Sequence, residues 1–492
     1  MPLPTPLYTA AQVRALDAYA IDTLGVAGYT LMKRAGEAGL RYLRTRWPTA
    51  HRIVIVCGGG NNGGDGYVLA RFAQAAGLTV TVLAAAAVER LRGDAHQACE
   101  DFKASGGRIV SFDASLLGNG DVVVDALLGT GLSTAVRADA AAVIRAINAS
   151  QRPVFALDVP SGLDSDRGIA LSEAVRATGT VCFVALKTGL FVGDGPDFTG
   201  SVFFDDLEIA VPATPQFQAR LERIGEAEVA RALPARSRAA NKGDFGHVLI
   251  VGSGTGMPGA TRLAGEACLR VGAGLVTVAV APDNVAAIAA GRPELICLPF
   301  SSEHDLAAAI ERADVIAIGP GLGRTDWAQA AFDRVVASDK PLVVDADALN
   351  LLSVAKRRRD NWILTPHPGE AGRLLGTDAK AVQADRLAAL DALVECYGGT
   401  VVLKGAGTLV ATAGATSGLC ERGNPGMATP GAGDVLTGAI AGILAQCRDA
   451  ALSARVGVWV HAMAGDSVAR GGGQRGLLAS DIARELRTWV NP

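Results

Sequence analysis

The chain of 492 residues is 49% hydrophobic and 19% charged, and its formal net charge at pH 7 is −3. This slight negative charge argues against a nucleic-acid-binding surface and against a polybasic membrane contact. No apolar run approaches the roughly 20 residues that span a bilayer, and the N-terminus lacks the pattern of a secretory signal, so we expect a soluble, cytoplasmic protein.

The N-terminal half alternates short apolar runs with amphipathic stretches. Residues 11–45 have helical periodicity on both sides of a turn at 25–28. Runs rich in Val and Ile then predict strands at residues 53–57, 79–84, 108–112, 122–129, 154–160 and 201–207. Because glycines bound these runs and helical patterns separate them, we expect parallel strands that are covered on both faces.

The pattern breaks between about residues 211 and 240, where proline and clustered charges replace the strand signal. It restarts with predicted strands at residues 247–252, 275–281, 315–321, 341–349, 362–366 and 400–405. We therefore predict two α/β domains, at residues 1–215 and 225–492, with the boundary in an irregular segment. The eight cysteines are scattered without CxxC spacing, which favours small core residues over a metal site.

The segment GGGNNGGDG, residues 58–66, follows the first predicted strand directly and opens a helical pattern. Bare backbone amides near a helix N-terminus can bind an anion. A glycine turn whose Asn and Asp side chains satisfy their own backbone remains the alternative for this segment alone. Asp125, Asp158 and Ser161 close two later strands, and the carboxyl ends of parallel strands line ligand crevices. These strand ends favour a ligand site, whose oxygen ligands suit a hard alkali cation.

Together with VDALLGTGLS, LDVPSGLDSD and ALKTGL, this segment resembles the YjeF N-terminal domain, the NAD(P)H-hydrate epimerase, over about residues 8–212. The resemblance implies a Rossmann-like three-layer fold and a potassium ion at Asn62, Asp125 and Ser161. Asp158 is our candidate for proton transfer at the hydrated carbon. The implied hydrate contacts are Asn61, Asn62, Gly63, Gly64, Asp65, Gly129, Thr130, Gly131, Leu132, Ser133, Thr134, Ala135 and Asp158.

A second glycine cluster, TPGAGDVLTG at residues 429–438, leads into a long apolar helix. Gly431, Ala432 and Gly433 would expose backbone amides at the helix start, and Asp434 lies in the first turn, where the helix dipole favours a carboxylate. A carboxylate beside such an anion hole suits phosphoryl transfer to a hydroxyl group. On this segment alone, Asp434 could equally be a simple helix cap.

Other polar residues of this half follow predicted strands. Asp345 and Asp347 lie in VVDADALN, and the motifs GPGLG, TPHPGE and KGAGT end three further strands. His367, between two prolines, is either a rigid turn residue or a substrate contact. His461 lies in a helical pattern, where packing is the favoured interpretation.

These motifs, with NKGDFGHVLIVG and GNPGMATPGAGDVLTG, resemble the ribokinase-like fold and, within it, the ADP-dependent NAD(P)H-hydrate dehydratases, over about residues 225–492. Pro430 departs from the usual second glycine and removes one amide donor. The implied hydrate contacts are Ala260, Gly321, His367 and Asp434. The implied nucleotide contacts are Lys404, Gly405, Ala406, Gly407, Thr408 and Gly433.

The two resemblances imply a bifunctional enzyme that repairs the hydrates NADHX and NADPHX. An isomerase activity would interconvert the R and S epimers, and a lyase activity would dehydrate the S epimer with ADP as co-substrate and Mg²⁺ as its companion. We expect a homo-oligomer with no nucleic-acid or membrane partner. Two alternatives remain: a ribokinase-like small-molecule kinase with a fused nucleotide-binding domain, and a non-enzymatic nucleotide sensor, against which Asp158 and Asp434 count.

Overall fold

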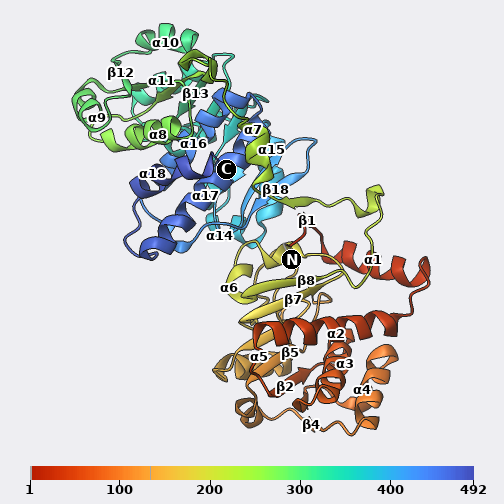
Figure 1. The fold of residues 1–492 in the computed structure, drawn as a ribbon. Coiled ribbons are helices and arrows are strands. Elements are labelled where there is room, and N and C mark those ends of the chain that lie inside the picture. The colour runs from red at the N-terminus through yellow and green to blue at the C-terminus, as the bar shows by residue number, and fades with distance from the viewer. Residues whose placement is uncertain (1–2, 133, 492) are drawn as a thin grey trace. The chain divides into compact units, whose positions relative to one another are not determined.

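The computed structural model describes residues 3–132 and 134–491. The chain divides into two compact units, Met1–Leu221 and Glu222–Pro492. Each unit alternates strands with helices around a sheet that is largely parallel (Figure 1). The predicted fold class, two α/β domains, is confirmed. No helix in the described ranges combines the length and apolar character that crossing a membrane requires.

Two helices precede the main sheet of the N-terminal unit. α1 (Ala10–Asp22) begins after Thr9, which forms a capping box with Gln12. The chain then turns at Gly25, whose φ of +70° is a conformation that glycine adopts without strain. α2 (Gly28–Arg46) follows. The helical periodicity of residues 11–45 therefore predicted both helices.

Seven strands of the described N-terminal unit form a parallel sheet in the order β4-β3-β2-β5-β6-β7-β8. The order reverses between β2 and β5, and ligands of open α/β sheets bind at such a reversal. The strands are β2 (Arg52–Cys57), β3 (Thr79–Ala84), β4 (Ile109–Ser111), β5 (Val122–Ala126), β6 (Val154–Leu157), β7 (Gly179–Phe183) and β8 (Ser201–Asp205). The remaining helices are α3 (Asn61–Ala75), α4 (Gly93–Ala104), α5 (Ala138–Ala149), α6 (Gly195–Thr199) and the 3₁₀ turns Val88–Arg90, Ala114–Asn119, Thr188–Leu190 and Pro215–Phe217.

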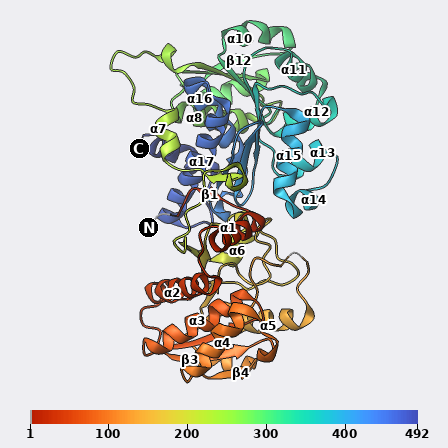
Figure 2. The same cartoon turned by 90° about the vertical axis from the view of Figure 1, so that its right-hand side faces the viewer.

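Apolar side chains of this sheet pack on both faces. Ile53 and Ile55 belong to a core that they share with α1 to α4, whereas Val54 and Val56 belong to a second core with α5. On the first face α3 and α4 lie side by side (Figures 1 and 2). Burial on both faces explains why these strands read as continuous apolar runs, as predicted.

The sheet of the C-terminal unit is parallel from β16 to β12, in the order β16-β15-β14-β13-β10-β11-β12, and β17 and β18 extend it as an antiparallel hairpin. Its order reverses between β10 and β13. The strands are β10 (His247–Val251), β11 (Leu275–Val280), β12 (Ile296–Pro299), β13 (Val315–Ile318), β14 (Leu342–Val344), β15 (Trp362–Leu364), β16 (Thr400–Leu403), β17 (Thr408–Thr412) and β18 (Ser417–Cys420). Two short strands, β1 (Pro6–Leu7) and β9 (Leu221–Arg223), complete the set that the structure describes.

Helix α16 runs through the core of the C-terminal unit and packs against α8 and α17. Most of its residues are buried, because the sequence AGDVLTGAIAGILAQC is apolar all round. The helices are α7 (Ala227–Ala232), α8 (Pro258–Arg270), α9 (Val285–Gly291), α10 (Ala307–Arg312), α11 (Asp326–Val336), α12 (Ala346–Ala355), α13 (Pro368–Leu375), α14 (Ala379–Ala384), α15 (Arg386–Tyr397), α16 (Ala432–Cys447), α17 (Ala450–Gly472) and α18 (Ala479–Trp489). The 3₁₀ turns are Lys242–Phe245, Pro282–Asn284, Glu303–Leu306 and Pro425–Met427.

Candidate active sites

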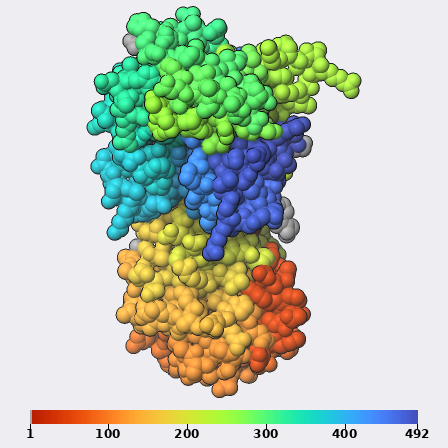
Figure 3. Space-filling view, turned by 90° about the vertical axis from the view of Figure 1, so that its left-hand side faces the viewer, coloured from red at the N-terminus to blue at the C-terminus, as the bar shows by residue number. Residues whose placement is uncertain are grey.

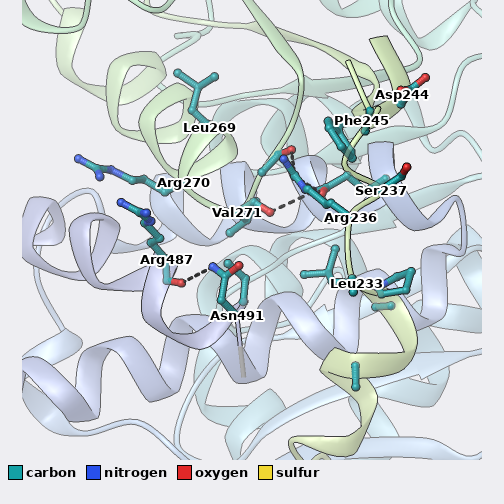
Figure 4. A pocket seen from close by; sticks show the side chains of 18 of the residues that line it. Leu233, Arg236, Ser237, Asp244, Phe245, Leu269, Arg270, Val271, Arg487 and Asn491 are labelled. Carbon is teal, nitrogen blue, oxygen red and sulfur yellow. Dashed lines mark hydrogen bonds between the residues drawn. The ribbon is translucent and has the colours of Figure 1, made fainter. Parts of the chain in front are cut away.

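A cavity of about 1080 Å³ in the C-terminal unit lies away from the predicted site residues. The segment 234–244, which is mostly exposed and projects from this unit (Figures 2 and 3), encloses it together with the C-terminal ends of α8 and α18. In Figure 4 the Arg236 guanidinium reaches across it, stacks on the Phe245 ring and donates a 2.5 Å hydrogen bond to the Gly272 carbonyl. None of the predicted catalytic, hydrate or nucleotide residues lines this cavity, so we place the chemistry elsewhere.

A cavity of about 720 Å³ in the N-terminal unit lies where the strand order reverses. The segments that follow β2 and β5 border it, as do α1 and α2. The predicted contacts that line it are Asn61, Asn62, Asp65, Gly129, Thr130, Gly131, Leu132 and Asp158. Gly63 and Gly64 are buried and do not line it, Thr134 and Ala135 are exposed beyond it, and Ser133 lies outside the described residues.

The glycine-rich segment after β2 is largely helical, which corrects the expectation of a bare loop. α3 begins at Asn61, so NNGGDG forms its first turns. A Cβ atom at Gly63 would lie 2.2 Å from the Gly58 carbonyl oxygen, and one at Gly58 would lie 1.9 Å from the Leu127 carbonyl oxygen. The glycines therefore let the start of α3 pack directly against the ends of β2 and β5. This close packing brings Asn61, Asn62 and Asp65 to the cavity.

Asp158, after β6, is held by an ion pair with Lys187. The Lys187 side chain is 1% exposed and also donates a 2.7 Å hydrogen bond to the Phe183 carbonyl. Burial is the largest single effect and lowers the pKa of Lys187, but the charge of Asp158, its hydrogen bond and the nearby Cys182 and Asp17 together raise that pKa above the ordinary value. The φ of Asp158 is +67°, a left-handed conformation that costs a non-glycine residue roughly 1–2 kcal/mol. Lys187 thus stays charged and holds the Asp158 side chain at the edge of the cavity.

Two other carboxyl groups, Asp17 and Asp65, line the same cavity. Neither makes a hydrogen bond or an ion pair with its side chain within the described ranges. Burial raises the pKa of Asp17 to about 6, against the opposing effect of Lys187. Burial also raises the pKa of Asp65 well above its usual range. Around Lys187 the cavity therefore contains one carboxylate and two carboxyl groups that retain protons more readily.

Asn62 and Ser161 both hydrogen-bond to the backbone of Leu128, and Asp125 accepts from the Leu127 amide at 3.2 Å. Asp125 is fully buried and accepts hydrogen bonds from the Ser161 amide and hydroxyl, at 2.8 and 2.6 Å. Burial raises the pKa of Asp125, and the bonds from Ser161 oppose this rise. Asn62 donates through Nδ2 to the Leu128 carbonyl at 2.9 Å, which leaves its buried Oδ1 without a partner. An orphaned amide oxygen beside a buried carboxyl group is a set of oxygens that a cation would satisfy.

In the C-terminal unit Gly321, His367 and Lys404 follow β13, β15 and β16, whereas Ala260 lies on α8 and Gly433 on α16. Gly321 faces Ala260 of α8, because a Cβ atom at Gly321 would lie 2.9 Å from the Ala260 Cβ. The Lys404 ammonium lies 2.8 Å from Asp345 Oδ1. A Cβ atom at Gly433 would lie 3.6 Å from Lys404 Nζ. The structure thus pairs two predicted hydrate contacts and two predicted nucleotide contacts.

Asp345 and Asp434 lie near Lys404 but differ in their partners. Asp345 accepts hydrogen bonds from Lys404 and from Thr437 Oγ1 at 2.7 Å. Burial favours its neutral form, yet Lys404 and Thr437 together hold the pKa of Asp345 below its usual value. Asp434 has no side-chain hydrogen bond or ion pair within the described ranges, and burial, reinforced by the charge of Asp345, raises its pKa to about 7. Asp434 can therefore exchange a proton near neutral pH, while Asp345 remains ionised.

The amides at the start of α16 form a smaller anion-binding surface than predicted. Gly431, the residue before the helix, has a φ of +87°, which suits glycine. The Ala432 amide donates to the Thr429 carbonyl at 3.3 Å, so it is not free for a ligand. The amides of Gly433 and Asp434 donate no hydrogen bond to a backbone carbonyl within the described residues.

Three buried or half-buried side chains position the loops of this site. His367 caps α13, because its Nδ1 accepts from the Gly369 amide at 3.0 Å, and burial lowers its pKa and favours this neutral acceptor. Arg386, 2% exposed, donates to the carbonyls of Leu403 and Lys404 at 3.1 and 3.3 Å and has no acidic partner among the described residues. His461 is buried in α17, in agreement with a packing role.

Several residues of these sites were missed from the sequence. Lys187 stands in the quoted motif ALKTGL and Glu370 in TPHPGE, so a signal for both existed. Asp17 lies in an ordinary amphipathic helix, and Arg386 follows a polar stretch, so neither carried a local signal. Only the fold brings these side chains to the strand ends.

Comparison with known proteins yields matches along the whole chain. The family model described as NAD(P)H-hydrate dehydratase matches residues 248–488, and that of the YjeF-related protein N-terminus matches residues 28–189. The bifunctional NAD(P)H-hydrate repair enzyme Nnr of Coxiella burnetii is 46% identical over 488 residues, which cover 99% of this chain and 100% of that protein. The enzyme of the same name from Escherichia coli is 40% identical over 490 residues, with 100% and 95% covered. A ribokinase-like superfamily protein from Enterococcus faecalis superposes with a TM-score of 0.52 at 31% identity, covering 55% of this chain and 95% of its own.

Proposed function

The chain belongs to the family of bifunctional NAD(P)H-hydrate repair enzymes, and from this premise we propose that its two units act in turn on one damaged cofactor. A reduced nicotinamide that has added water at C6 exists as R and S hydrates, NADHX and NADPHX. The N-terminal unit interconverts the two epimers. The C-terminal unit dehydrates the S epimer at the expense of ADP and releases NAD(P)H, AMP and phosphate. One observation carries the proposal: each matched unit contains its own buried lysine–aspartate pair beside a carboxyl group that titrates near neutrality.

The hydrate binds in the 720 Å³ cavity of the N-terminal unit. Asn61, Asp65 and the segment 129–132 line this cavity and contact the ligand. Asp158 takes part in proton transfer at C6. The buried ammonium of Lys187 pairs with Asp158 and fixes its side chain in place.

Potassium fits the oxygens of Asn62, Asp125 and Ser161. The site offers one carboxylate, one amide oxygen without a partner and one hydroxyl, and the described residues contain no cluster of three or more His, Cys, Asp or Glu side chains that could hold a metal. A single carboxylate among neutral oxygens suits a monovalent cation. When bound, the ion supplies positive charge next to the segment 127–131, which borders the hydrate cavity.

In the C-terminal unit the hydrate contacts Ala260, Gly321 and His367, and the nucleotide contacts the segment 404–408 and Gly433. Asp434 accepts the proton of the C6 hydroxyl as that oxygen attacks the β-phosphorus of ADP. AMP leaves from that phosphorus. Phosphate then departs from C6 with its bonding electrons, and loss of the C5 proton forms the double bond of the nicotinamide. The Lys404 ammonium and the free amides of α16 stabilise the negative charge of the transferred group.

A magnesium ion suits this site, where it would bind the phosphates of the nucleotide. This ion is commonly held by one or two carboxylates together with substrate phosphates. Glu370 Oε2 lies 3.7 Å from Lys404 Nζ, and Asp347 accepts a 2.9 Å hydrogen bond from the Gly323 amide; these two carboxyl groups would hold the ion with the phosphates of ADP. It would neutralise charge on the phosphoryl group during transfer.

A mixture of the purified chain with both hydrate epimers, with and without ADP, tests the proposal by the recovery of nicotinamide absorbance. With ADP we expect complete recovery, since epimerisation feeds the S form. Without ADP we expect no recovery, although the epimers still interconvert on a chiral-resolving column. A stable phosphorylated alcohol in place of NAD(P)H would indicate the kinase alternative instead.

A further inference from the structure

A stripe of α1 faces the hydrate cavity. Val13, Arg14, Asp17 and Ile21 all line the cavity, and their spacing places them along one side of the helix. The same helix is anchored by Leu16 and Ala20, which are fully buried. Asp17 is therefore held at the cavity by a rigid element that approaches from a different part of the fold than Asp158, which follows β6.

We propose that Asp17 is a second catalytic residue of the N-terminal site and exchanges protons with the C6 oxygen opposite Asp158. This inference rests on the epimerase function proposed above and deepens it, because the family resemblance pointed to Asp158 alone. Epimerisation at a carbon that carries a hydroxyl needs one group to release a proton and another to accept one.

The charges around the cavity separate the roles of its acids. Asp158 forms an ion pair with the buried Lys187, whereas Asp17 has no such partner, and burial raises the pKa of Asp17 to about 6. Two carboxyl groups whose environments differ in this way are a common acid and base arrangement. The charged and titratable groups that line the cavity around Asp17 are Arg14, Asp65, Asp94, Arg137, Asp158 and Lys187.

Asp65 is the competing candidate for the acid. Burial raises its pKa well above the usual range, and the charges of Asp158 and Asp17 add to this. A group that keeps its proton across neutral pH donates hydrogen bonds but is a poor proton carrier, since efficient general acids titrate near the working pH. Asp17 meets that requirement and is also partly exposed, so it can exchange its proton with solvent.

The chemical step balances as follows. The Asp17 carboxyl group gives its proton to the C6 hydroxyl, the C6–O bond breaks with its electron pair on oxygen, and water leaves. The N1 lone pair forms a C6=N1 double bond, which makes C6 planar. A water molecule then adds to the opposite face of C6 and gives its proton to the Asp158 carboxylate. The proton returns to Asp17 through solvent, and the opposite epimerisation runs the same steps in reverse.

The test compares Asp17→Asn with the matched control Asp22→Asn, an exposed aspartate at the end of the same helix. We expect epimerisation to fall about 10²-fold or more in Asp17→Asn and to stay normal in the control. Dehydration of the pure S epimer with ADP should be unchanged in both variants, and the N-terminal unit should unfold in urea at the wild-type midpoint in both, which shows that this unit is folded. Asp17→Glu should restore part of the epimerisation.

Two readouts distinguish a catalytic from a structural role. In the wild type, kcat/KM for epimerisation should change slope near pH 6, and Asp17→Asn should lose this change of slope. Turnover in water enriched in oxygen-18 should label C6 once for each epimerisation. Epimerisation in Asp17→Asn within threefold of the wild type, with the same pH profile, overturns the assignment of Asp17, and turnover without label overturns the C–O cleavage step. Absence of epimerisation in the wild type and in Asp22→Asn alike overturns the proposed function itself.

Discussion

Both units set a buried lysine against an aspartate, yet the paired aspartate has a different position in each. In the N-terminal unit the side chain of Asp158, the partner of Lys187, is 15% exposed and borders the hydrate cavity. In the C-terminal unit the side chain of Asp345, the partner of Lys404, is 2% exposed, and the acid that we propose exchanges a proton is its neighbour Asp434. The same ion pair therefore either presents a carboxylate to the ligand or adjusts an adjacent acid.

The exposure of the paired aspartate decides between these roles. A carboxylate that reaches the cavity can contact a ligand directly, whereas one enclosed by protein acts only through its field. In both units the unpaired acid, Asp17 or Asp434, has the pKa raised toward neutrality. In each unit the lysine pairs with one aspartate. The aspartate without a lysine partner is the one that we propose exchanges protons.

The largest effects should separate the two activities completely. We expect Asp434→Asn to lower dehydration about 10³-fold, because it removes the acceptor of the hydroxyl proton, and to leave epimerisation intact. Asp158→Asn should do the opposite. Epimerisation is followed by chromatography of the hydrates, and dehydration by nicotinamide absorbance from the S epimer. A variant that lost both activities together would break the picture of two independent sites.

Replacement of Lys187 should destabilise the N-terminal unit. Lys187→Met leaves a largely buried carboxylate without its counter-charge, and we expect the free energy of unfolding to fall by about 3 kcal/mol. Lys103→Met is the matched control, since its pair with Glu100 is exposed to solvent and contributes little to stability. Urea denaturation gives both values, and equal stability of the two variants would contradict a structural role for the Lys187 pair.

The pH dependence should show Asp434 as the titrating acid of the C-terminal site. Because a general base must be ionised, kcat/KM for dehydration should rise about tenfold per pH unit up to about pH 7 and then level off. In the unfolded chain the Asp434 carboxyl group would have its ordinary pKa of 3.8, so it would lose its proton at a lower pH than in the folded chain. This group therefore makes the unit less stable as pH rises between about 4 and 7. In Asp434→Asn both dependences should disappear.

Glycine substitutions should affect the two sites in different ways. A Cβ atom at Gly63 would lie 2.2 Å from a backbone oxygen, so Gly63→Ala should lower the stability of the N-terminal unit by about 2 kcal/mol. At Gly433 the nearest atoms, Lys404 Nζ and Asp345 Oδ2, are 3.6 and 3.7 Å away. Gly433→Ala should therefore leave stability unchanged and raise the KM for ADP several-fold. Equal stability losses in the two variants would contradict this contrast.

Potassium should have the smallest effect and should act on the N-terminal unit alone. At a concentration tenfold above its dissociation constant, the ion should stabilise this unit by about 1.4 kcal/mol relative to choline chloride of equal ionic strength. Ser161→Ala, which removes the hydroxyl that bonds Asp125, should abolish the difference. Thermal unfolding monitored for each unit provides the measurement, and a shift of the C-terminal transition of the same size would show a nonspecific salt effect.

Most of the central strands could be predicted because each is buried on both faces and so reads as an apolar run between glycines. The described strands that were missed are β1, β7, β9, β12 and the hairpin β17–β18. β7 (Gly179–Phe183) merges with the apolar stretch that follows it, and β17 (Thr408–Thr412) has only three apolar residues between two threonines. For these strands the local pattern is ambiguous, and tertiary pairing decides the structure.

The candidate sites were predictable where chemistry coincides with a strand end. Asp158 and Asp434 stand beside glycine-rich motifs, so residue type and position pointed to them together. Asp17 reaches its cavity from a helix near the N-terminus, and its distinguishing property, the lack of a partner, exists only in the folded chain. The helical start of α3 was missed because glycine opposes helix formation locally, while close packing against Gly58 requires it.

The burial of Arg386 has a consequence for how nucleotide binding responds to dissolved salt. Its guanidinium lies against the carbonyls of the loop that we propose to hold ADP, and its pKa, lowered by burial to about 10, still leaves it charged at physiological pH. Ions in solution screen exposed charges over roughly 10 Å at 0.1 M but reach enclosed ones poorly. The loop therefore contacts an enclosed side chain that stays positively charged. Its attraction for phosphate should persist at high salt concentration, at which the charge of a surface arginine would be largely screened.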